Sequence, residues 1–386
     1  MKDFRFNVQT ATYFGRGCIE KNTALFKTYG SKALVITGPH LSGRLSEAKH
    51  PAVADVEAAL KKEGIEYMLI DEVEIDPPVE TCVRLAAKAR PFGADLIIGV
   101  GGGSSLDSAK AIGILLDYPE DADPYEVFYQ KVTSYQNIVT QCKRNIIGIP
   151  TTAGTGSELS PYAVLTRADI HTKLAMFTWT YCVAAFIDPS YIETAPDMIL
   201  HTGAFDALAH GVESYLHTGN NAMSRLFCEF GFSLFKGFKD ALVSGELTQD
   251  DYDKIALHSA IMGLAFSSAG ASTTLPHGMG YPLSHIKHVN HGLSCAVFLG
   301  EYVRGFKDQS IVQPLVEQCG FKNSDEFADY CNEFINRHID IEVSEEELQS
   351  WTDDFMKTGR MATNPEQLTR DEVYELYKKS LAKYLK

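Results

Sequence analysis

Residues 95–110 read DLIIGVGGGSSLDSAK, a short apolar run followed by three glycines and a helix-forming segment. A continuous apolar run such as Asp95–Val100 is typical of a strand buried on both faces of a parallel sheet. The helix predicted after the glycines continues through Lys110 to Leu116. A strand, a glycine turn and a helix in this order predict one unit of a Rossmann-like α/β domain.

The same alternation of strand and helix recurs on both sides of this stretch. Further strands are predicted at Lys32–Thr37, Tyr67–Ile70, Asn145–Pro150 and Val183–Ile187, helices at Pro51–Glu63 and Val79–Ala89, and a hairpin from Pro161–Thr166 and Lys173–Phe177. Short strands that alternate with longer helices predict a parallel sheet. From Asp188 onward strand-like runs vanish and long helical periods begin. The sequence therefore predicts a dinucleotide-binding α/β domain over residues 1–187 and an all-helical metal-binding and substrate domain over residues 188–386.

Composition and charge limit the classes of function. The net charge of -15 argues against a nucleic-acid partner, because such partners require clustered Lys and Arg. No apolar run approaches the roughly 20 residues of a membrane span, and the first residues lack a signal-peptide core. The eight cysteines contain no CxxC pair and are typical of reduced, buried thiols. We therefore expect a cytoplasmic protein, without a membrane partner, that acts on a small molecule.

Two strand ends are candidate ligand sites, because ligands of open parallel sheets bind beyond the carboxyl ends of the strands. Gly101 to Gly103 would let the backbone approach a phosphate, and the following helix N-terminus would offer N–H donors. The loop from Thr151 to Glu158 presents hydroxyls and backbone donors that suit ribose or phosphate. A glycine turn that only allows close packing, and a self-capped turn, are the alternatives. Two such loops in one sheet favour a ligand.

Two clusters of metal-type side chains lie in the helical half. Asp206 and His210 are four residues apart and so project from one face of a helix. The second cluster contains four of the twelve histidines: His277, His285, His288 and His291. Three imidazoles and one carboxylate suit a borderline divalent ion such as Fe(II) or Zn(II). Spacing alone does not show which of the four histidines bind the ion. The pair His288 and His291, in an HxxH spacing, is nearly as good a candidate as any other pair.

Taken together, these motifs resemble the iron-containing (group III) alcohol dehydrogenase family, in the superfamily of glycerol dehydrogenase and dehydroquinate synthase. The resemblance covers nearly the whole chain. The segments that carry it are GGGSSLDSAK (101–110), PTTAGTGSE (150–158), IDP (187–189), TGAFDALAHGVE (202–213) and HGMGYPL (277–283). It implies a metal-dependent enzyme that transfers hydride between NAD(P)(H) and a small primary alcohol or aldehyde, assembled as a homo-oligomer, with a dimer favoured.

The resemblance also implies which residues bind the metal. The ligands of Fe(II) or Zn(II) would be Asp206, His210, His277 and His291. His285 and His288 would then line the pocket or the surface. Glu213 lies one turn beyond the second ligand, where it would either support the metal site or serve as a solvated or helix-pairing residue.

Cofactor contacts follow from the resemblance in the same way. The residues implied are Gly102, Gly103, Ser104, Asp107, Thr151, Thr152, Thr155 and Lys173. NAD-preferring members of the family tend to have an acidic residue at position 38, at the end of the strand predicted at Lys32–Thr37. There its carboxylate accepts hydrogen bonds from the adenosine ribose hydroxyls and repels a 2′-phosphate. This chain has Gly38 there. We therefore expect NADP(H) to be accepted and preferred over NAD(H).

One position departs from the family pattern. Many members have a histidine with a proton-relay role where this chain has Tyr281. A phenol is a poorer proton shuttle than imidazole at neutral pH. Either Tyr281 donates a hydrogen bond, or protons leave through water and the nicotinamide ribose.

A lyase of the dehydroquinate synthase type is the alternative function. Such an enzyme needs several basic groups around a phosphorylated or polyhydroxy acid substrate. The loops nearest the two clusters contain only Lys287 and Arg304. The sequence therefore favours a dehydrogenase.

Overall fold

The computed structural model describes residues 3–4, 6–129, 142–170, 172–178, 180–267, 272–335 and 337–386. Two compact units make up the chain. One runs from Val8 to Ala195, and the other contains Pro196–Lys386 together with the described residues ahead of Val8.

The first unit is built on a six-stranded parallel sheet. Its strands are β1 (Ala11–Phe14), β2 (Lys32–Ile36), β3 (Glu66–Ile70), β4 (Leu96–Gly101), β5 (Asn145–Pro150) and β8 (Ala184–Ile187). They lie in the order β1-β8-β5-β4-β2-β3. A separate antiparallel pair, β6 (Val164–Arg167) and β7 (Thr172–Ala175), forms the predicted hairpin. The predicted α/β fold class is confirmed, and β1, which the sequence did not predict, adds a parallel edge strand.

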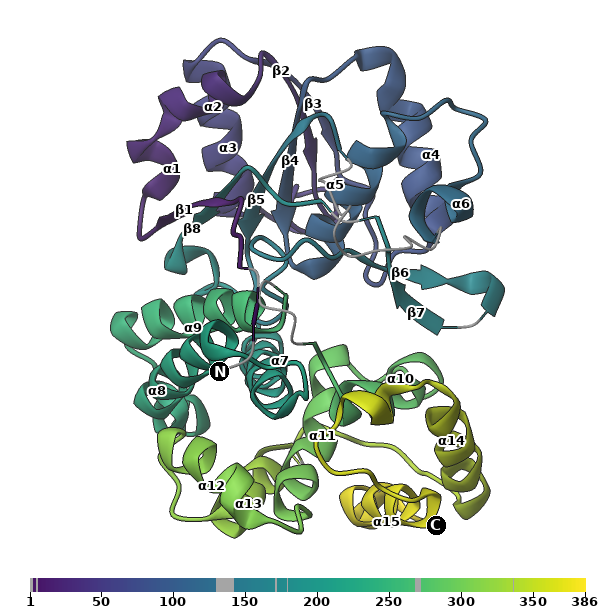
Figure 1. Ribbon diagram of the computed structural model, residues 1–386. Coiled ribbons are helices and arrows are strands. Elements are labelled where there is room, and N and C mark those ends of the chain that lie inside the picture. The colour runs from purple at the N-terminus through teal and green to yellow at the C-terminus, as the bar shows by residue number, and fades with distance from the viewer. Residues whose placement is uncertain are drawn as a thin grey trace. The chain divides into compact units, whose positions relative to one another are not determined.

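Helices cover both faces of this sheet (Figure 1). The helices on one face are α1 (Cys18–Lys21), α2 (Thr23–Tyr29) and α3 (Pro51–Lys62), and those on the other are α4 (Val79–Ala89), α5 (Gly103–Leu115) and α6 (Pro124–Tyr129). Successive strand residues alternate between the two cores: Val35 packs with the first group of helices, whereas Leu34 and Ile36 pack with the second. Burial on both sides explains why these strands appear as unbroken apolar runs in the sequence.

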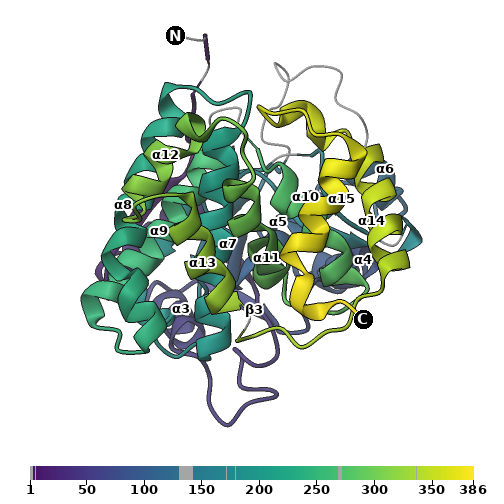
Figure 2. The ribbon, with the colours of Figure 1, turned by 90° about the horizontal axis from the view of Figure 1, so that it is seen from below.

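The second unit is helical, as predicted. Its helices are α7 (Asp197–Leu216), α8 (Ala222–Ser244), α9 (Gln249–Ser267), α10 (Leu275–His285), α11 (His291–Arg304), α12 (Gln309–Gln318), α13 (Ser324–Ile335), α14 (Glu345–Lys357) and α15 (Arg370–Ser380). Helix α7 packs against α8, α9 and α11 and is buried over most of its length (Figure 2). Polar side chains on α7 therefore point into the protein, where they need polar partners or a bound ion. None of the helices within the described ranges combines the length and apolar character that a bilayer span requires.

The two units divide later in the chain than the sequence indicated. The predicted boundary is Asp188, whereas the compact units separate between Ala195 and Pro196. The intervening residues stay with the sheet because the aromatic ring of Tyr191 is buried in the core under α1–α3. At the other end, Phe6 lies against Phe227 of α8, with ring centroids 5.6 Å apart, so the start of the chain belongs to the helical unit.

Candidate metal centre

Helix α7 supplies three buried polar side chains on one stretch. Asp206, His210 and Glu213 are spaced at four and three residues, so they line one side of the helix. All three are less than a tenth exposed, and Glu213 is fully buried. Burial alone would raise the pKa of Asp206, but the neighbouring histidines, His210 first among them, hold it well below its usual range. Asp206 is therefore an anion in the interior, which requires compensation by a positive charge.

Glu213 fixes the position of His277, at the start of α10. Its Oε2 accepts hydrogen bonds from the backbone nitrogen of Thr274 at 2.5 Å and from that of His277 at 3.3 Å. Its Oε1 pairs with Nδ1 of the His277 ring. The other ring nitrogen, Nε2, then faces Oδ1 of Asp206 at 3.5 Å. This is how a carboxylate orients a metal-binding imidazole from behind.

Helix α11 brings His291 to the same place. The helix begins at His291 after the cap residue Asn290, whose side chain accepts a hydrogen bond from the Gly292 nitrogen at 3.0 Å. A Cβ atom on Gly292 would lie 2.2 Å from the carbonyl oxygen of Thr202 and 3.1 Å from Cβ of Asp206. Only glycine lets the first turn of α11 approach α7 this closely, and this approach sets His291 beside Asp206.

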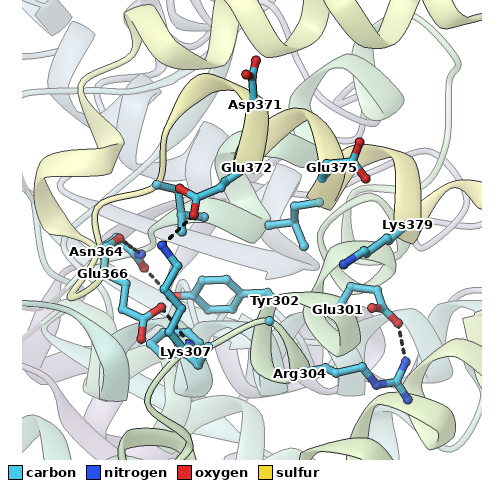
Figure 3. A pocket seen from close by; sticks show the side chains of 14 residues that line it. Glu301, Tyr302, Arg304, Lys307, Asn364, Glu366, Asp371, Glu372, Glu375 and Lys379 are labelled. Carbon is cyan, nitrogen blue, oxygen red and sulfur yellow. Dashed lines mark hydrogen bonds and ion pairs between the residues drawn. The ribbon is translucent and has the colours of Figure 1, made fainter.

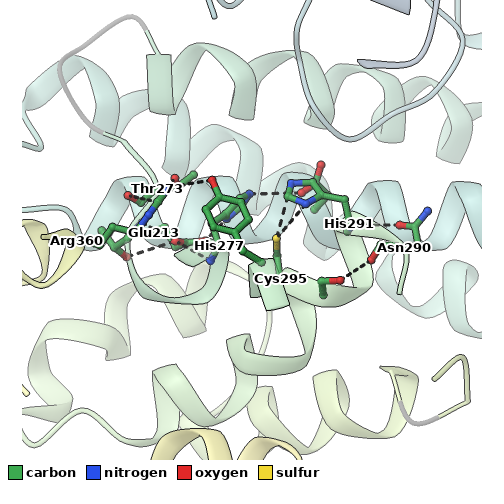
Figure 4. Close-up of polar contacts among 12 residues, drawn as sticks. Glu213, Thr273, His277, Asn290, His291, Cys295 and Arg360 are labelled. Atoms are coloured by element: carbon green, nitrogen blue, oxygen red, sulfur yellow. Dashed lines mark hydrogen bonds and ion pairs between the residues drawn. The ribbon is translucent and has the colours of Figure 1, made fainter. Parts of the chain in front are cut away.

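Four donor side chains meet at this point, and Figure 4 labels three of them, His277, His291 and Cys295. One ligand atom from each of Asp206, His277, His291 and Cys295 lies within 4.8 Å of the other three. Oδ1 of Asp206 and Nε2 of His277 are buried and complete no hydrogen bond within the described residues. Buried polar atoms without partners are rare in folded proteins, so these two indicate a ligand between them. The oxygen, nitrogen and sulfur donors fit a borderline divalent ion.

The structure brings together three of the four predicted ligands in this group and sets the fourth beside it. The His210 ring stacks on Phe266, with centroids 4.4 Å apart, and lies 4.5 Å from the His277 ring. It is not among the four residues whose donor atoms converge. Burial lowers the pKa of His210 to about 4, so its imidazole is neutral at neutral pH. Cys295 takes a place in the group that the sequence did not indicate.

The two other histidines of the second cluster, His285 and His288, are not part of the donor group. His285 ends α10, and His288 is exposed in the following turn with a φ of 57°. A further histidine of this unit, His258 on α9, is fully buried, and its Nδ1 contacts the carbonyl oxygen of Gly231 at 2.9 Å.

Tyr281 follows His277 by one turn of α10, and its hydroxyl is hydrogen-bonded to the guanidinium of Arg360. Nη2 of Arg360 donates a hydrogen bond to the Tyr281 hydroxyl at 2.9 Å, and Nη1 donates to Oγ1 of Thr273 at 2.9 Å. The hydroxyl therefore accepts a charged hydrogen bond and keeps its own proton to donate. Arg360 is distant in sequence from every motif, and sequence reasoning missed it.

The two strand-end loops of the sheet unit touch each other. A Cβ atom on Gly103 would lie 2.8 Å from Cγ2 of Thr155, and one on Gly102 would lie 2.9 Å from Oγ1 of Thr152. The backbone nitrogen of Thr151 donates to the carbonyl of Gly101 at 3.1 Å. The residues predicted to contact a nucleotide from these loops are thus adjacent, at the carboxyl ends of β4 and β5.

Asp107 and Lys110 of α5 hold the second loop in place. The Asp107 carboxylate accepts a hydrogen bond from Oγ of Ser157 at 2.5 Å. Nζ of Lys110 is fully buried and donates to the carbonyl oxygens of Ser157, Ser160 and Tyr162 at 2.6–2.9 Å. Asp107 therefore anchors the loop at Ser157 from inside the protein. Lys110 anchors the chain from Ser157 to Tyr162, a role that the sequence analysis does not assign to it.

Ser104 and Lys173 both contact Asp76. The Ser104 hydroxyl accepts a hydrogen bond from the Asp76 nitrogen at 3.0 Å, and Nζ of Lys173 forms an ion pair with its carboxylate at 2.6 Å. Gly38 follows β2 and opens a loop that contains Arg44. The Arg44 guanidinium is half exposed, donates to the carbonyl oxygen of Asp71 at 2.8 Å and forms an ion pair with the Asp71 carboxylate at 3.3 Å.

The helical unit also contains a cavity of about 440 Å³ between α11 and α15 (Figure 3). Its lining includes Tyr302, whose hydroxyl donates to Asn364 at 2.6 Å, and the ion pair between Lys307 and Glu372 at 2.6 Å. None of the predicted site residues lines it. This cavity is therefore distinct from the donor group.

Comparison with known protein families identifies the class and the family of this chain. Residues 9–189 match the family model described as iron-containing alcohol dehydrogenase, and residues 200–381 match the C-terminal model of the same family. The class is that of oxidoreductases. The chain belongs to the iron-containing alcohol dehydrogenase family.

Relatives that match over most of their lengths support this membership. An NADPH-dependent butanol dehydrogenase of Clostridium saccharobutylicum is 31% identical over 80% of this chain and 75% of its own length. Long-chain-alcohol dehydrogenase 1 of Geobacillus thermodenitrificans is 29% identical over 96% of this chain and 95% of its own. The crystal structure of an iron-containing alcohol dehydrogenase of Thermotoga maritima matches with a TM-score of 0.85 and 26% identity, covering 98% of this chain and 100% of that one.

Proposed function

We propose that this chain is a divalent-metal-dependent oxidoreductase that interconverts small primary alcohols and aldehydes and prefers NADP(H) to NAD(H). The observation that carries the proposal is the pair of buried, unpartnered donors, Oδ1 of Asp206 and Nε2 of His277, beside His291. The Clostridium relative is named for NADPH and butanol, which supports both the nucleotide and the substrate class.

The metal-binding part of the proposal rests on named side chains. Asp206, His277 and His291 would hold Fe(II) or Zn(II), with a fourth donor from His210 or Cys295. A bound divalent ion supplies Lewis acidity to an alcohol or carbonyl oxygen. The protein holds the His277 ring through Glu213 and buries the donors, which excludes water from them.

The nucleotide would lie against the two touching loops of the sheet unit. Its proposed contacts are Gly102, Gly103, Ser104, Thr151, Thr152, Thr155 and Lys173, with Asp107 acting through the loop that it anchors. Gly38 presents no carboxylate to repel a 2′-phosphate, and the half-exposed guanidinium of Arg44 in the same loop would attract one.

Tyr281 would act as a hydrogen-bond donor to the reacting oxygen. Because Arg360 donates to the phenol oxygen at 2.9 Å, the hydroxyl proton points away from Arg360 and is available to another acceptor. This arrangement favours the first of the two roles predicted for Tyr281.

The basic residues that a lyase of the dehydroquinate synthase type would use are already paired. Lys287 forms an ion pair with Glu347 at 2.7 Å, and Arg304 forms one with Asp325 at 3.0 Å. This supports a dehydrogenase. We also propose a cytoplasmic homodimer, the assembly common in the family; all eight cysteines are free and buried, as expected of a reducing compartment.

The test is a panel of straight-chain aldehydes and alcohols with NADPH and NADH, run on protein of measured metal content. We expect turnover in proportion to bound metal and a higher kcat/KM with NADPH. His277→Ala should lose both metal and turnover. Full turnover by a metal-free His277→Ala variant would refute the metal's role, and a clear preference for NADH would refute the cofactor assignment.

A further inference from the structure

Arg360 contacts the segment that carries His277 at two points. Nη1 donates to Oγ1 of Thr273, just ahead of α10, at 2.9 Å, a contact that Figure 4 shows. Nη2 donates to the hydroxyl of Tyr281, within α10, also at 2.9 Å. Thr273 precedes His277 by four residues, and Tyr281 follows it by four. The guanidinium therefore joins the two ends of the segment whose midpoint is a proposed metal ligand.

The stem of Arg360 lies directly on the backbone of α10. A Cβ atom on Gly278 would lie 2.6 Å from Cδ of Arg360 and 2.8 Å from Cε2 of Phe355 on α14. Gly278 follows His277 in the chain, so the missing side chain there lets the arginine cross the helix beside this histidine. The guanidinium carbon then lies 5.2 Å from the centroid of the Tyr281 ring, close enough for a cation–π interaction.

The backbone that carries Arg360 is itself held in place. Arg360 opens the 3-10 helix η5 (Arg360–Thr363), after Gly359 with a φ of 72°, a left-handed conformation that glycine adopts without strain. The carbonyl oxygen of Thr363 accepts a hydrogen bond from the nitrogen of Thr218 at 2.9 Å, and its hydroxyl donates to the carbonyl oxygen of Arg360 at 2.8 Å. The side chain therefore extends from a tethered turn, as a residue that positions another requires.

The guanidinium binds neutral oxygens only. Within the described residues its hydrogen bonds go to the hydroxyl of Tyr281 and to the hydroxyl and carbonyl oxygens of Thr273. Hydrogen bonds from a charged donor are stronger than those between neutral groups. Helix α10 needs such support, because two glycines and Pro282 disfavour a helix in this segment. The contacts of Arg360 therefore stabilise the position of Tyr281 on the helix that also carries His277.

We propose that Arg360 is a positioning residue of the reaction, which holds the phenol of Tyr281 in place by binding Tyr281 and Thr273 at once. This inference rests on the proposed function, in which Tyr281 donates a hydrogen bond to the reacting oxygen. Arg360 acts through the phenol and not on the substrate. A guanidinium presents its donors in a rigid planar fork, whereas a lysine ammonium is a single point charge on a flexible chain. Only arginine can therefore hold both hydroxyls in this geometry.

Substitution of Arg360 gives the first test, on the full-length protein loaded with metal. We expect Arg360→Ala and Arg360→Lys each to lower kcat/KM by about tenfold and to retain bound metal. Arg225→Ala is the matched control, because Nη1 of Arg225 also donates to a tyrosine hydroxyl, that of Tyr215, at 3.1 Å. The control should leave kcat/KM unchanged. Full activity of Arg360→Lys would overturn the proposal, because charge alone would then suffice.

A double-mutant cycle shows whether Arg360 acts through Tyr281. Two residues that act as a unit lose no more together than one of them loses alone. We therefore expect Arg360→Ala combined with Tyr281→Phe to lower kcat/KM by about tenfold, as each single substitution does. A loss of about a hundredfold, the product of two independent effects, would overturn the proposal. So would a loss in Arg360→Ala that excess metal fully restores, because Arg360 would then support His277 instead.

Added guanidinium distinguishes positioning from general damage to the fold. Guanidinium chloride, at concentrations too low to unfold the protein, should restore part of the activity of Arg360→Ala and none of that of the double variant. Equal restoration of the two variants would contradict a role through Tyr281. Circular dichroism verifies that each variant is folded.

The outcomes also separate this proposal from the proposed function. Turnover by the unaltered protein, with unchanged kcat/KM in Arg360→Ala, would overturn the role of Arg360 and leave the dehydrogenase standing. Absence of turnover by the unaltered, metal-loaded protein with every alcohol and aldehyde of the panel would overturn both.

Discussion

The carboxylate of Glu213 holds His277 at two places, the backbone nitrogen and Nδ1 of the ring. The sequence left open whether Glu213 supports the metal site or is a solvated residue; its full burial and its contacts place it behind the imidazole. Burial alone would raise the pKa of Glu213, but the charge of His277 lowers it, so this carboxylate is ionised. An ionised carboxylate fixes the ring with Nε2 directed at Asp206.

Glu213→Gln should weaken metal binding. The amide has nearly the shape of the carboxylate but lacks its charge, so the ring is held less firmly and is a weaker donor. We expect zinc or iron affinity to fall by about 10–100-fold, measured by competition with a chelating dye. Excess metal should restore turnover. Glu246→Gln, on an exposed turn of the same unit, is the matched control, and equal affinities of the two variants would contradict this role for Glu213.

Tyr281→Phe should lower kcat/KM by about tenfold and leave metal content unchanged. The reason is the hydrogen bond from Arg360, which directs the phenol proton toward another acceptor. A hydrogen-bond donor that does not itself exchange protons affects the rate at all pH values equally, so the shape of the pH profile should be retained. Unchanged kcat/KM across the pH range would remove Tyr281 from the reaction, whereas loss of one limb of the profile would indicate a true proton relay.

Arg44→Ala tests the nucleotide preference. Arg44 lies in the loop that Gly38 opens, and its guanidinium is half exposed. If it binds a 2′-phosphate, its loss should reduce kcat/KM for NADPH by about tenfold and leave kcat/KM for NADH nearly unchanged. Arg84→Ala removes a similarly exposed arginine, paired with Glu72 in the same unit, and should change neither value. Equal losses with both nucleotides would show that Arg44 acts only on the loop's structure.

The sheet could be predicted from sequence because burial on both faces leaves a clear pattern. The five strands from β2 to β5 and β8 are apolar along their whole length or nearly so, and each was predicted within a residue or two. The sequence does not predict β1, because its four residues (Ala11–Phe14) include a polar threonine and are largely exposed, whereas β3, at the opposite edge, contains an apolar run.

The proposed metal centre is predictable from sequence only where its residues lie close together in the chain. Asp206 and His210 share one helix, and the motif around His277 is distinctive. The place of Cys295 depends on the packing of α10 and α11, which glycines at 280 and 292 make possible. The helix α10 itself contains two glycines and Pro282, a composition that disfavours a helix in isolation. Tertiary packing overrides that propensity, and sequence periodicity does not report it.

Glu158 gives a prediction of pH-dependent stability that is independent of the metal centre. It lies in the loop anchored by Lys110, is 3% exposed, and burial raises its pKa from 4.5 to about 7. Between about pH 4.5 and pH 7, the Glu158 carboxyl is therefore protonated in the folded chain and ionised in the unfolded chain. Stability decreases as pH rises through this window and remains lower above it, by on the order of 3 kcal/mol.

Glu158→Gln removes this titration, because an amide resembles the protonated carboxyl at every pH. We expect its melting temperature to match that of the unaltered protein near pH 5 and to exceed it by several degrees at pH 8, measured by calorimetry on both proteins. Glu20→Gln, at an exposed position of α1, should show no such difference. An identical offset for Glu158→Gln at the two pH values would mean that Glu158 is ionised in the folded chain at pH 5, because a neighbouring positive charge outweighs its burial.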